Sequence, residues 1–208
     1  MTNPIADSVN AWLAAEGIDR ASYTTIMRRW VRPAYADGAD ANPVHALERG
    51  ECAHEEFEQA LARELVLVTG GPVAAANLLE RMFGGSRLDE SMLGLFRQLH
   101  AAGVPTGVLS NSWGGGGYPR ELFPELFDVV VISSEVGMRK PEPRIFRHAV
   151  ALLGLQPAEC IFIDDIEANV VAAEQVGFTG LLHRDSDDTI ERVAELLGVR
   201  LGQAVAGD

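Results

Sequence analysis

The chain has 208 residues, 47% of them hydrophobic and 23% charged, which fits one ordinary domain or one domain with a small insert. Its 17 Lys and Arg residues against 30 Asp and Glu residues give a net charge of −13, which argues against binding to nucleic acid or to an anionic membrane surface. The two cysteines are too few for a disulfide framework, no apolar run is long enough to cross a membrane, and the start does not resemble a signal peptide. We therefore expect a cytoplasmic protein.

Residues 5–86 are predicted to form a module of amphipathic helices without a strand. Val9, Trp12 and Leu13 share one face of the first helix, which ends near Gly17. Another helix is marked by Phe57 and by the two leucines that follow at helical spacing, and a further one is predicted over 77–82.

From residue 87 to residue 201, helices alternate with short apolar runs. The spacing predicts helices over 88–102, 143–153, 167–176 and 189–197, and strands over 104–109, 129–132, 160–163 and 180–182. This alternation indicates an α/β domain with a parallel sheet covered on both faces. Residues 202–208 are predicted to be a frayed tail.

Polar residues follow these apolar runs at the positions where open α/β sheets bind ligands. Ser110 and Asn111 offer a hydroxyl, an amide and backbone N–H groups to phosphate oxygens, although such residues also serve in ordinary turns. Asp164 and Asp165 are adjacent carboxylates, which repel one another unless a cation or a basic group lies between them, and Mg²⁺ prefers such oxygen ligands. The alternative is that Asp165 caps the helix that follows.

Lys140 directly precedes the segment Pro141-Glu142-Pro143. The two prolines stiffen the approach to the next helix and favour a defined position for the ammonium group, whereas a solvated surface lysine is the ordinary alternative. The five histidines are scattered without metal-binding spacing, and we expect them to be structural or surface residues.

A Ser at one strand end, a Lys before a Pro-Glu-Pro helix start and then an Asp pair, in this order, resemble the haloacid dehalogenase-like (HAD) hydrolase superfamily. The resemblance covers essentially the whole chain. Val108-Leu109-Ser110-Asn111 looks like the second family motif, Lys140 with its Pro-Glu-Pro segment like the third, and Ile161-Phe162-Ile163-Asp164-Asp165 like the fourth. The leading helices resemble the small cap of 2-haloacid dehalogenases, phosphoglycolate-phosphatase-like enzymes and the N-terminal phosphatase domain of soluble epoxide hydrolases. The turn Leu47-Glu48-Arg49-Gly50 fits the last group best.

The resemblance implies a Rossmann-like parallel sheet core (87–201) with a small α-helical cap (5–86), and a Mg²⁺-dependent phosphatase that acts on a small phosphate monoester through an aspartyl-phosphate. Catalytic roles would belong to Lys140, Ser110 and Asp164, and Asn111 would bind substrate together with Ser110 and Lys140. Asp165 would be the direct Mg²⁺ ligand and Asp164 would also serve the metal. Asn169 would not contact the metal itself and would orient Lys140 and the water molecules bound to the metal.

The chain departs from the family at its first motif. No Asp-x-Asp occurs before the cap, and Asp7-Ser8 matches the positions that usually follow this motif. We therefore expect a sheet that lacks its central strand, between the runs 104–109 and 160–163. We also expect little or no turnover by these 208 residues, because the nucleophile is missing, and a natural chain that carries the motif upstream of Met1.

Two other functions stay open. The first is a non-catalytic relative that binds phosphate or a partner protein. The second is a 2-haloacid dehalogenase-like hydrolase, which also uses a carboxylate nucleophile but needs no metal. The Asp pair together with Asn169 favours the phosphatase.

Overall fold

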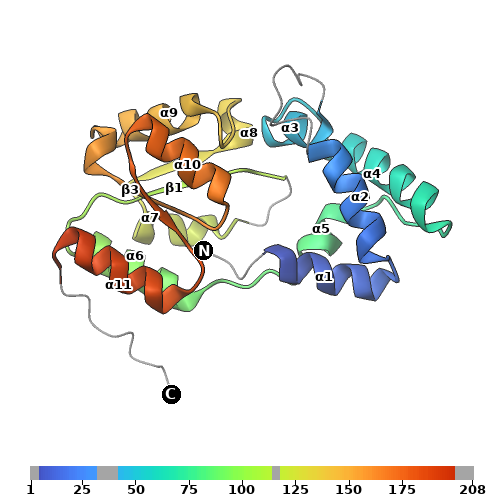
Figure 1. Ribbon diagram of the computed structural model, residues 1–208, viewed down its shortest axis with the longest axis horizontal. Coiled ribbons are helices and arrows are strands. Elements are labelled where there is room, and N and C mark those ends of the chain that lie inside the picture. The colour runs from blue at the N-terminus through green and yellow to red at the C-terminus, as the bar shows by residue number, and fades with distance from the viewer. Residues whose placement is uncertain (1–4, 32–41, 114–117, 200–208) are drawn as a thin grey trace.

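The computed structural model describes residues 5–31, 42–113 and 118–199, and it contains a group of helices beside an α/β part (Figure 1). Within these residues, no helix is long and apolar enough to cross a membrane. The segment 202–208, predicted as a frayed tail, lies outside the described residues.

The cap helices pack around one apolar core. They are α1 (Ile5–Glu16), α2 (Arg20–Val31), α3 (Pro43–Glu48), α4 (His54–Thr69) and α5 (Leu78–Phe83). The predicted inward faces of α1 and α4 are buried in this core, which confirms the helical periodicity of the sequence. The division from the α/β part near residue 86 stays a prediction.

Among the described residues, the α/β part contains four short strands between its helices. Its elements are α6 (Glu90–Ala101), β1 (Gly107–Ser110), the 3₁₀ helix η2 (Arg120–Leu122), α7 (Phe123–Leu126), β2 (Val129–Ile132), α8 (Ser133–Val136), α9 (Pro143–Leu153), the 3₁₀ helix η3 (Pro157–Glu159), β3 (Ile161–Asp164), α10 (Glu167–Val176), β4 (Thr179–Leu182) and α11 (Ser186–Leu197).

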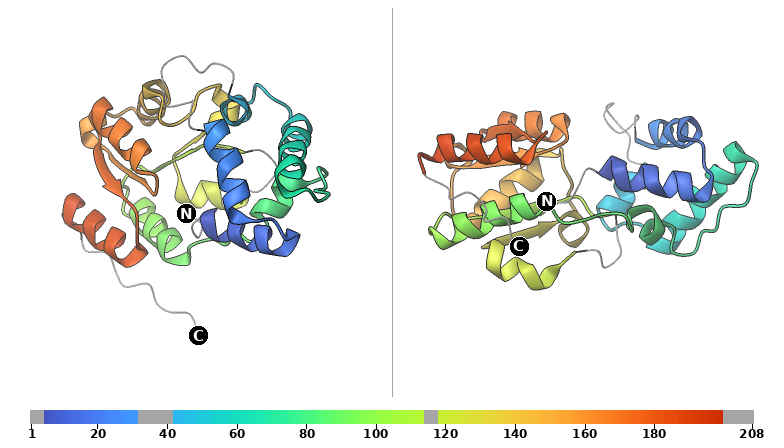
Figure 2. Two further views of the ribbon diagram at one scale, coloured as in Figure 1. Left: turned by 45° about the vertical axis from the view of Figure 1, so that its right-hand side comes forward. Right: turned by 90° about the horizontal axis from the view of Figure 1, so that it is seen from below.

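Helices cover both faces of the strands, as predicted (Figures 1 and 2). Phe162 of β3 packs with Ile145 and Phe146 of α9 and with the alanines of α10. The next residue, Ile163, points to the other face and packs with residues of α6 and α11. The sequence therefore folds as a helix–sheet–helix sandwich beside the cap helices.

The sheet is divided into two parallel pairs. β1 pairs with β2, from Gly107 opposite Val129 to Ser110 opposite Ile132, and β3 pairs with β4, from Ile161 opposite Thr179 to Asp164 opposite Leu182. No described strand joins one pair to the other. The halves are connected instead through helices, since α9 contacts β1 and β2, α10 contacts β3 and β4, and the two helices contact each other. This is the break in the sheet that the missing motif led us to expect.

The predicted boundaries were wrong in a few places. Residues 104–106 are not part of β1, which begins at Gly107. The N–H of Thr106 donates to the Asp128 carboxylate and its hydroxyl donates to the carbonyl of Leu126, so Thr106 is bonded mainly to the turn before β2. The last helix begins at Ser186 rather than at residue 189, because the Asp185 side chain caps it. The sequence also gave no signal for the four-residue helices α7 and α8.

Candidate functional site

Lys140 and Asp164 form an ion pair where β3 ends. Lys140 Nζ lies 2.6 Å from Asp164 Oδ2, and the two side chains are 11% and 5% exposed. Two buried charges stabilise one another only when they are in close contact. The ion pair therefore holds both side chains in place. The ammonium also lies 5.7 Å from the centre of the Phe162 ring, which favours a cation there.

Asp164 is held by further hydrogen bonds. Its Oδ1 accepts from the backbone N–H of Ile166 at 2.8 Å and from Asn169 Nδ2 at 3.0 Å. Asn169 is buried on α10, so it orients Asp164 directly and acts on Lys140 only through this carboxylate. Both oxygens of Asp164 are therefore already engaged by groups of the chain itself.

Asn111 holds the backbone of Lys140. Its Nδ2 donates to the carbonyl of Lys140 at 3.0 Å, and its Oδ1 accepts from the N–H of Lys140 at 2.8 Å. Because both ends of the amide are used, Asn111 fixes the lysine relative to the end of β1. Its predicted contact with a substrate stays a prediction.

Ser110 lies at the end of β1, half-buried, with its Oγ 2.8 Å from Tyr118 Oη. Burial raises the pKa of Tyr118 above its ordinary value, so the phenol stays protonated at neutral pH and can share its hydrogen with Ser110. Sequence analysis missed Tyr118, because it belongs to no motif and follows a run of four glycines.

Asp165 is exposed, unlike its neighbour Asp164. It does not cap α10: the N-cap position is Ile166, and no side chain caps this helix. Among the described residues, no group of three or more His, Cys, Asp or Glu side chains could hold a metal ion. The carboxylates have the chemistry that Mg²⁺ prefers, but Asp164 is engaged, so the described residues do not make a complete Mg²⁺ site.

Lys140 is also the only lysine of the chain, since the 17 basic residues are otherwise all arginines. Arginine and lysine differ in shape, because the guanidinium is a wide planar fork and the ammonium is a compact point charge. The one compact cation of the chain thus lies beside Asp164. The single lysine is visible in the sequence and marks the same position as the Pro-Glu-Pro segment.

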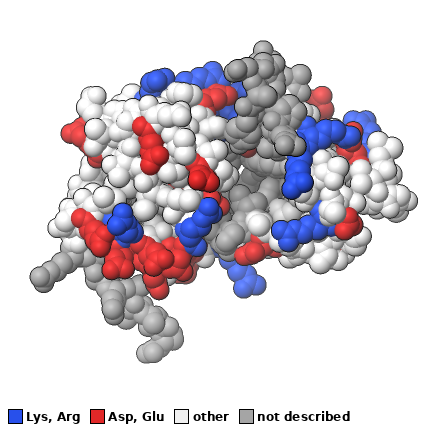
Figure 3. Space-filling model, in the orientation of Figure 1, with Lys and Arg blue, Asp and Glu red and all other residues white. Residues whose placement is uncertain are grey.

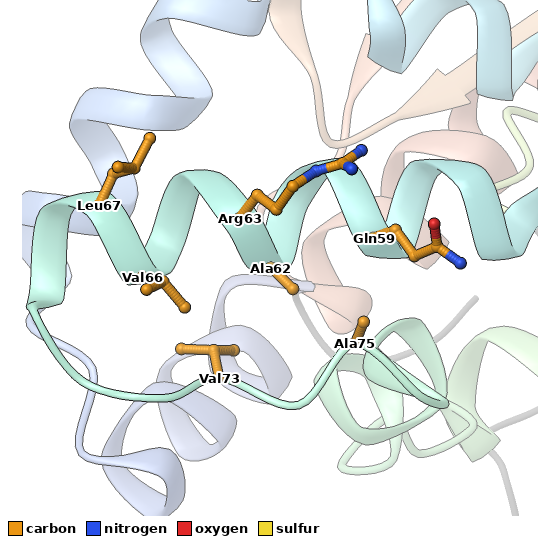
Figure 4. Close-up of a pocket in the computed structure, with 7 residues that line it drawn as sticks. All are labelled: Gln59, Ala62, Arg63, Val66, Leu67, Val73 and Ala75. Atoms are coloured by element: carbon orange, nitrogen blue, oxygen red, sulfur yellow. The ribbon is translucent and has the colours of Figure 1, made fainter.

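Other surface features lie away from these residues. A groove of about 510 Å³ on the outer side of α4 is lined by cap residues alone: Gln59, Ala62, Arg63, Val66, Leu67, Val73 and Ala75 (Figure 4). Acidic side chains gather over the part of the surface where α6 and α11 lie (Figure 3). Neither feature contains a candidate site residue.

The chain is similar to several known proteins. The family description "haloacid dehalogenase-like hydrolase" matches residues 1–177. The chain is 32% identical to the sesquiterpene phosphatase astK of Aspergillus oryzae over 154 residues, which cover 73% of this chain and 77% of that protein. It is 30% identical to acyl-CoA dehydrogenase family member 10 of Mus musculus over 181 residues, covering 85% of this chain but only 16% of the relative. Bifunctional epoxide hydrolase 2 of Sus scrofa is 28% identical over 137 residues, which cover 62% of this chain and 25% of that protein.

Solved structures show the same fold. A HAD family enzyme from Bacteroides thetaiotaomicron, in complex with magnesium and inorganic phosphate, superposes with a TM-score of 0.54 at 21% identity, covering 80% of this chain and 87% of that one. The family match spans most of the chain, and the three predicted motifs meet where the strands end. The chain belongs to the haloacid dehalogenase-like hydrolase family.

Proposed function

We propose that the site serves the hydrolysis of a small phosphate monoester. The observation that carries this proposal is the set formed by Lys140, Asp164 and Asn111, which brings a fixed ammonium group to the carboxyl ends of β1 and β3. A fixed cation at this edge neutralises charge on phosphoryl oxygens without having to reorganise during the reaction. The phosphatase named among the relatives supports the same class of substrate.

The individual residues would divide the work as follows. Ser110 Oγ and the N–H groups after β1 would hold phosphoryl oxygens, and Lys140 would balance their charge. Asp164 would keep the ammonium in position, with Asn169 behind it. Asp165, whose carboxylate is exposed, would contribute one ligand to Mg²⁺, an ion that supplies charge neutralisation in phosphoryl transfer.

The described residues do not provide the carboxylate nucleophile that this reaction needs. No described strand lies between β1 and β3, and therefore no carboxylate ends such a strand. Covalent catalysis needs this carboxylate. The 208-residue chain is therefore expected to bind the phosphoryl group of a phosphate monoester and to hydrolyse the ester very slowly. The same observation favours a second candidate, a phosphate-binding protein without catalysis.

The single lysine offers a direct test of phosphate binding. With isotope-labelled lysine, the side chain of Lys140 gives one NMR signal, which can be followed while inorganic phosphate is added. We expect a saturable change in this signal, and a weaker one in the Ser110→Ala variant. A signal that moves no more with phosphate than with chloride at the same ionic strength would overturn the proposal.

A further inference from the structure

The turn after α3 contacts the α/β part on both sides of Lys140. Glu48 forms an ion pair with Arg139, and Arg49 forms one with Glu142, Nη1 to Oε1 at 3.4 Å. Two adjacent cap residues of opposite charge thus bind two residues of opposite charge that flank the lysine. Each segment carries one negative and one positive side chain. If the turn were shifted by one residue, Arg49 would face Arg139 or Glu48 would face Glu142, and like charges would repel one another.

Glu48 is the central residue of this contact. Its side chain is 7% exposed and that of Arg139 is 6% exposed, so neither charge has water as a substitute partner. Glu48 Oε1 also accepts a hydrogen bond from Trp113 Nε1 at 3.0 Å, so one carboxylate joins the loop after β1 to the segment that carries Lys140.

The backbone of Glu48 adds a third link. Its carbonyl accepts from Ser133 Oγ at 2.5 Å, and the same Oγ accepts from the N–H of Ser112 at 2.8 Å. The ends of β1 and β2 are therefore tied to the cap through a single residue. The approach is close, since a Cβ added at Gly50 would lie 2.6 Å from the carbonyl oxygen of Ser134.

The segment that the cap holds has little freedom of its own. Glu142 Oε2 accepts from the N–H of Arg139 at 3.3 Å and from Arg144 Nε at 2.6 Å. Asn111 holds the backbone of Lys140 from the opposite side. The backbone around Lys140 is therefore held both by the end of β1 and by the cap.

We propose that residues 47–50 form a clamp that couples the seating of the cap to the placement of the Lys140 ammonium group. This makes Glu48 a positioning residue for the proposed phosphohydrolase, on whose function that role rests. If the cap moved away from the α/β part, its ion pairs with Arg139 and Glu142 would break together. The segment between these two residues, which carries Lys140, would then be less restrained. The cap would thus control the position of the Lys140 ammonium group as well as cover the site.

The test measures the chemical reactivity of Lys140 and needs no turnover. Acetic anhydride is added in limiting amount, and mass spectrometry of the peptide that contains Lys140 gives the rate of its acetylation. In Glu48→Gln the clamp loses its charge, and we expect acetylation to be faster by about fivefold or more, the lower range for coupled sites. Glu48→Asp, which keeps the charge, should restore much of the protection.

The matched control is Glu58→Gln. Glu58 is likewise a buried cap glutamate, but it accepts from the backbone of Leu79 within the cap. Equal acetylation rates in the Glu48 and Glu58 variants, or an unchanged rate in Glu48→Gln, would overturn the clamp. If Glu48→Gln does not fold, Arg49→Gln removes the weaker arm, and it must then raise the rate above that of Glu58→Gln. A protein that shows this pattern but binds no phosphate would refute the proposed function and leave the coupling intact.

Discussion

Lys140 and Asp164 show how much the site depends on single side chains. Each is a charge that has been taken out of water, and each is neutralised mainly by the other. Removing one partner leaves the other charged and buried, which is more costly than removing both. Breaking the pair is therefore expected to destabilise the fold, apart from its effect on the proposed chemistry.

The first prediction concerns this pair. Lys140→Met should lower the free energy of unfolding by about 3–5 kcal/mol, since Asp164 then lies buried without its cation. Urea unfolding measures the change, and the double variant Lys140→Met/Asp164→Asn should be more stable than Lys140→Met alone. If adding Asp164→Asn gives further destabilisation, the pair is not coupled in this way.

The second prediction concerns His45, which faces the clamp from α3. Burial lowers its pKa to about 4, with Arg139 and Arg49 acting in the same direction and Glu142 opposing them. An unfolded chain has a histidine pKa near 6.5, so between about pH 4 and pH 6.5 the unfolded state binds more protons than the folded state. Stability from this residue should therefore be complete above about pH 6.5 and fall as the pH drops towards 4.

Thermal unfolding at several pH values checks this dependence. His45→Gln should show a shallower loss of stability over that window than the unaltered chain. His54→Gln, which changes an exposed histidine, should keep the original slope. Identical slopes in all three proteins would mean that His45 does not carry the dependence.

At the scale of elements, the sequence predicted the longer helices and the meeting point of the motifs. α9 and α10 begin and end at the predicted residues, because Pro143 starts the first and left-handed glycines end both, at Gly154 and Gly177. Asn111, Lys140 and Asp164 come together because β1 and β3 both end beside the turn that carries Lys140.

Other features depend on contacts that no local pattern carries. Glu48 and Arg139 are 91 residues apart in the sequence, and neither shows a periodicity that points to the other. Tyr118 is eight residues from Ser110 in the sequence, and no local pattern shows that its hydroxyl lies beside Ser110 Oγ. The amide of Asn111 was expected to bind substrate, and only the folded chain shows that it holds the lysine backbone.

The third prediction belongs to the turn that ends α3. Gly50 and Gly17 both have positive φ, +72° and +68°, but a Cβ at Gly17 meets nothing within 4 Å. Gly17→Ala should cost about 1 kcal/mol, which is the backbone strain alone. Gly50→Ala should cost clearly more, because its Cβ also collides with the backbone of Ser134.

Urea unfolding of the two variants separates the collision from the strain. The excess for Gly50→Ala should be accompanied by faster acetylation of Lys140, whereas Gly17→Ala should leave that rate unchanged. Equal destabilisation of both variants would show that the cap turn does not press on α8.

At the scale of the whole molecule, the divided sheet is the defining feature. Helix packing joins the two strand pairs without hydrogen bonds between β1 and β3 among the described residues. Backbone groups that face such a break need partners, so the break is the natural place for a further strand. The site residues lie at the ends of the strands on either side of it, where a carboxylate from that strand would face Lys140.

The most direct test of this account is phosphate release by a chain extended at its amino terminus with an apolar strand of about five residues that ends in Asp-x-Asp. We predict Mg²⁺-dependent hydrolysis of an aryl phosphate in the range of ordinary enzymes, about 1–10³ per second. The 208-residue chain, and the extended chain with the first added Asp replaced by Asn, should be slower by about 10³-fold or more. An extended chain that releases no phosphate, or a 208-residue chain that is equally active, would contradict the account.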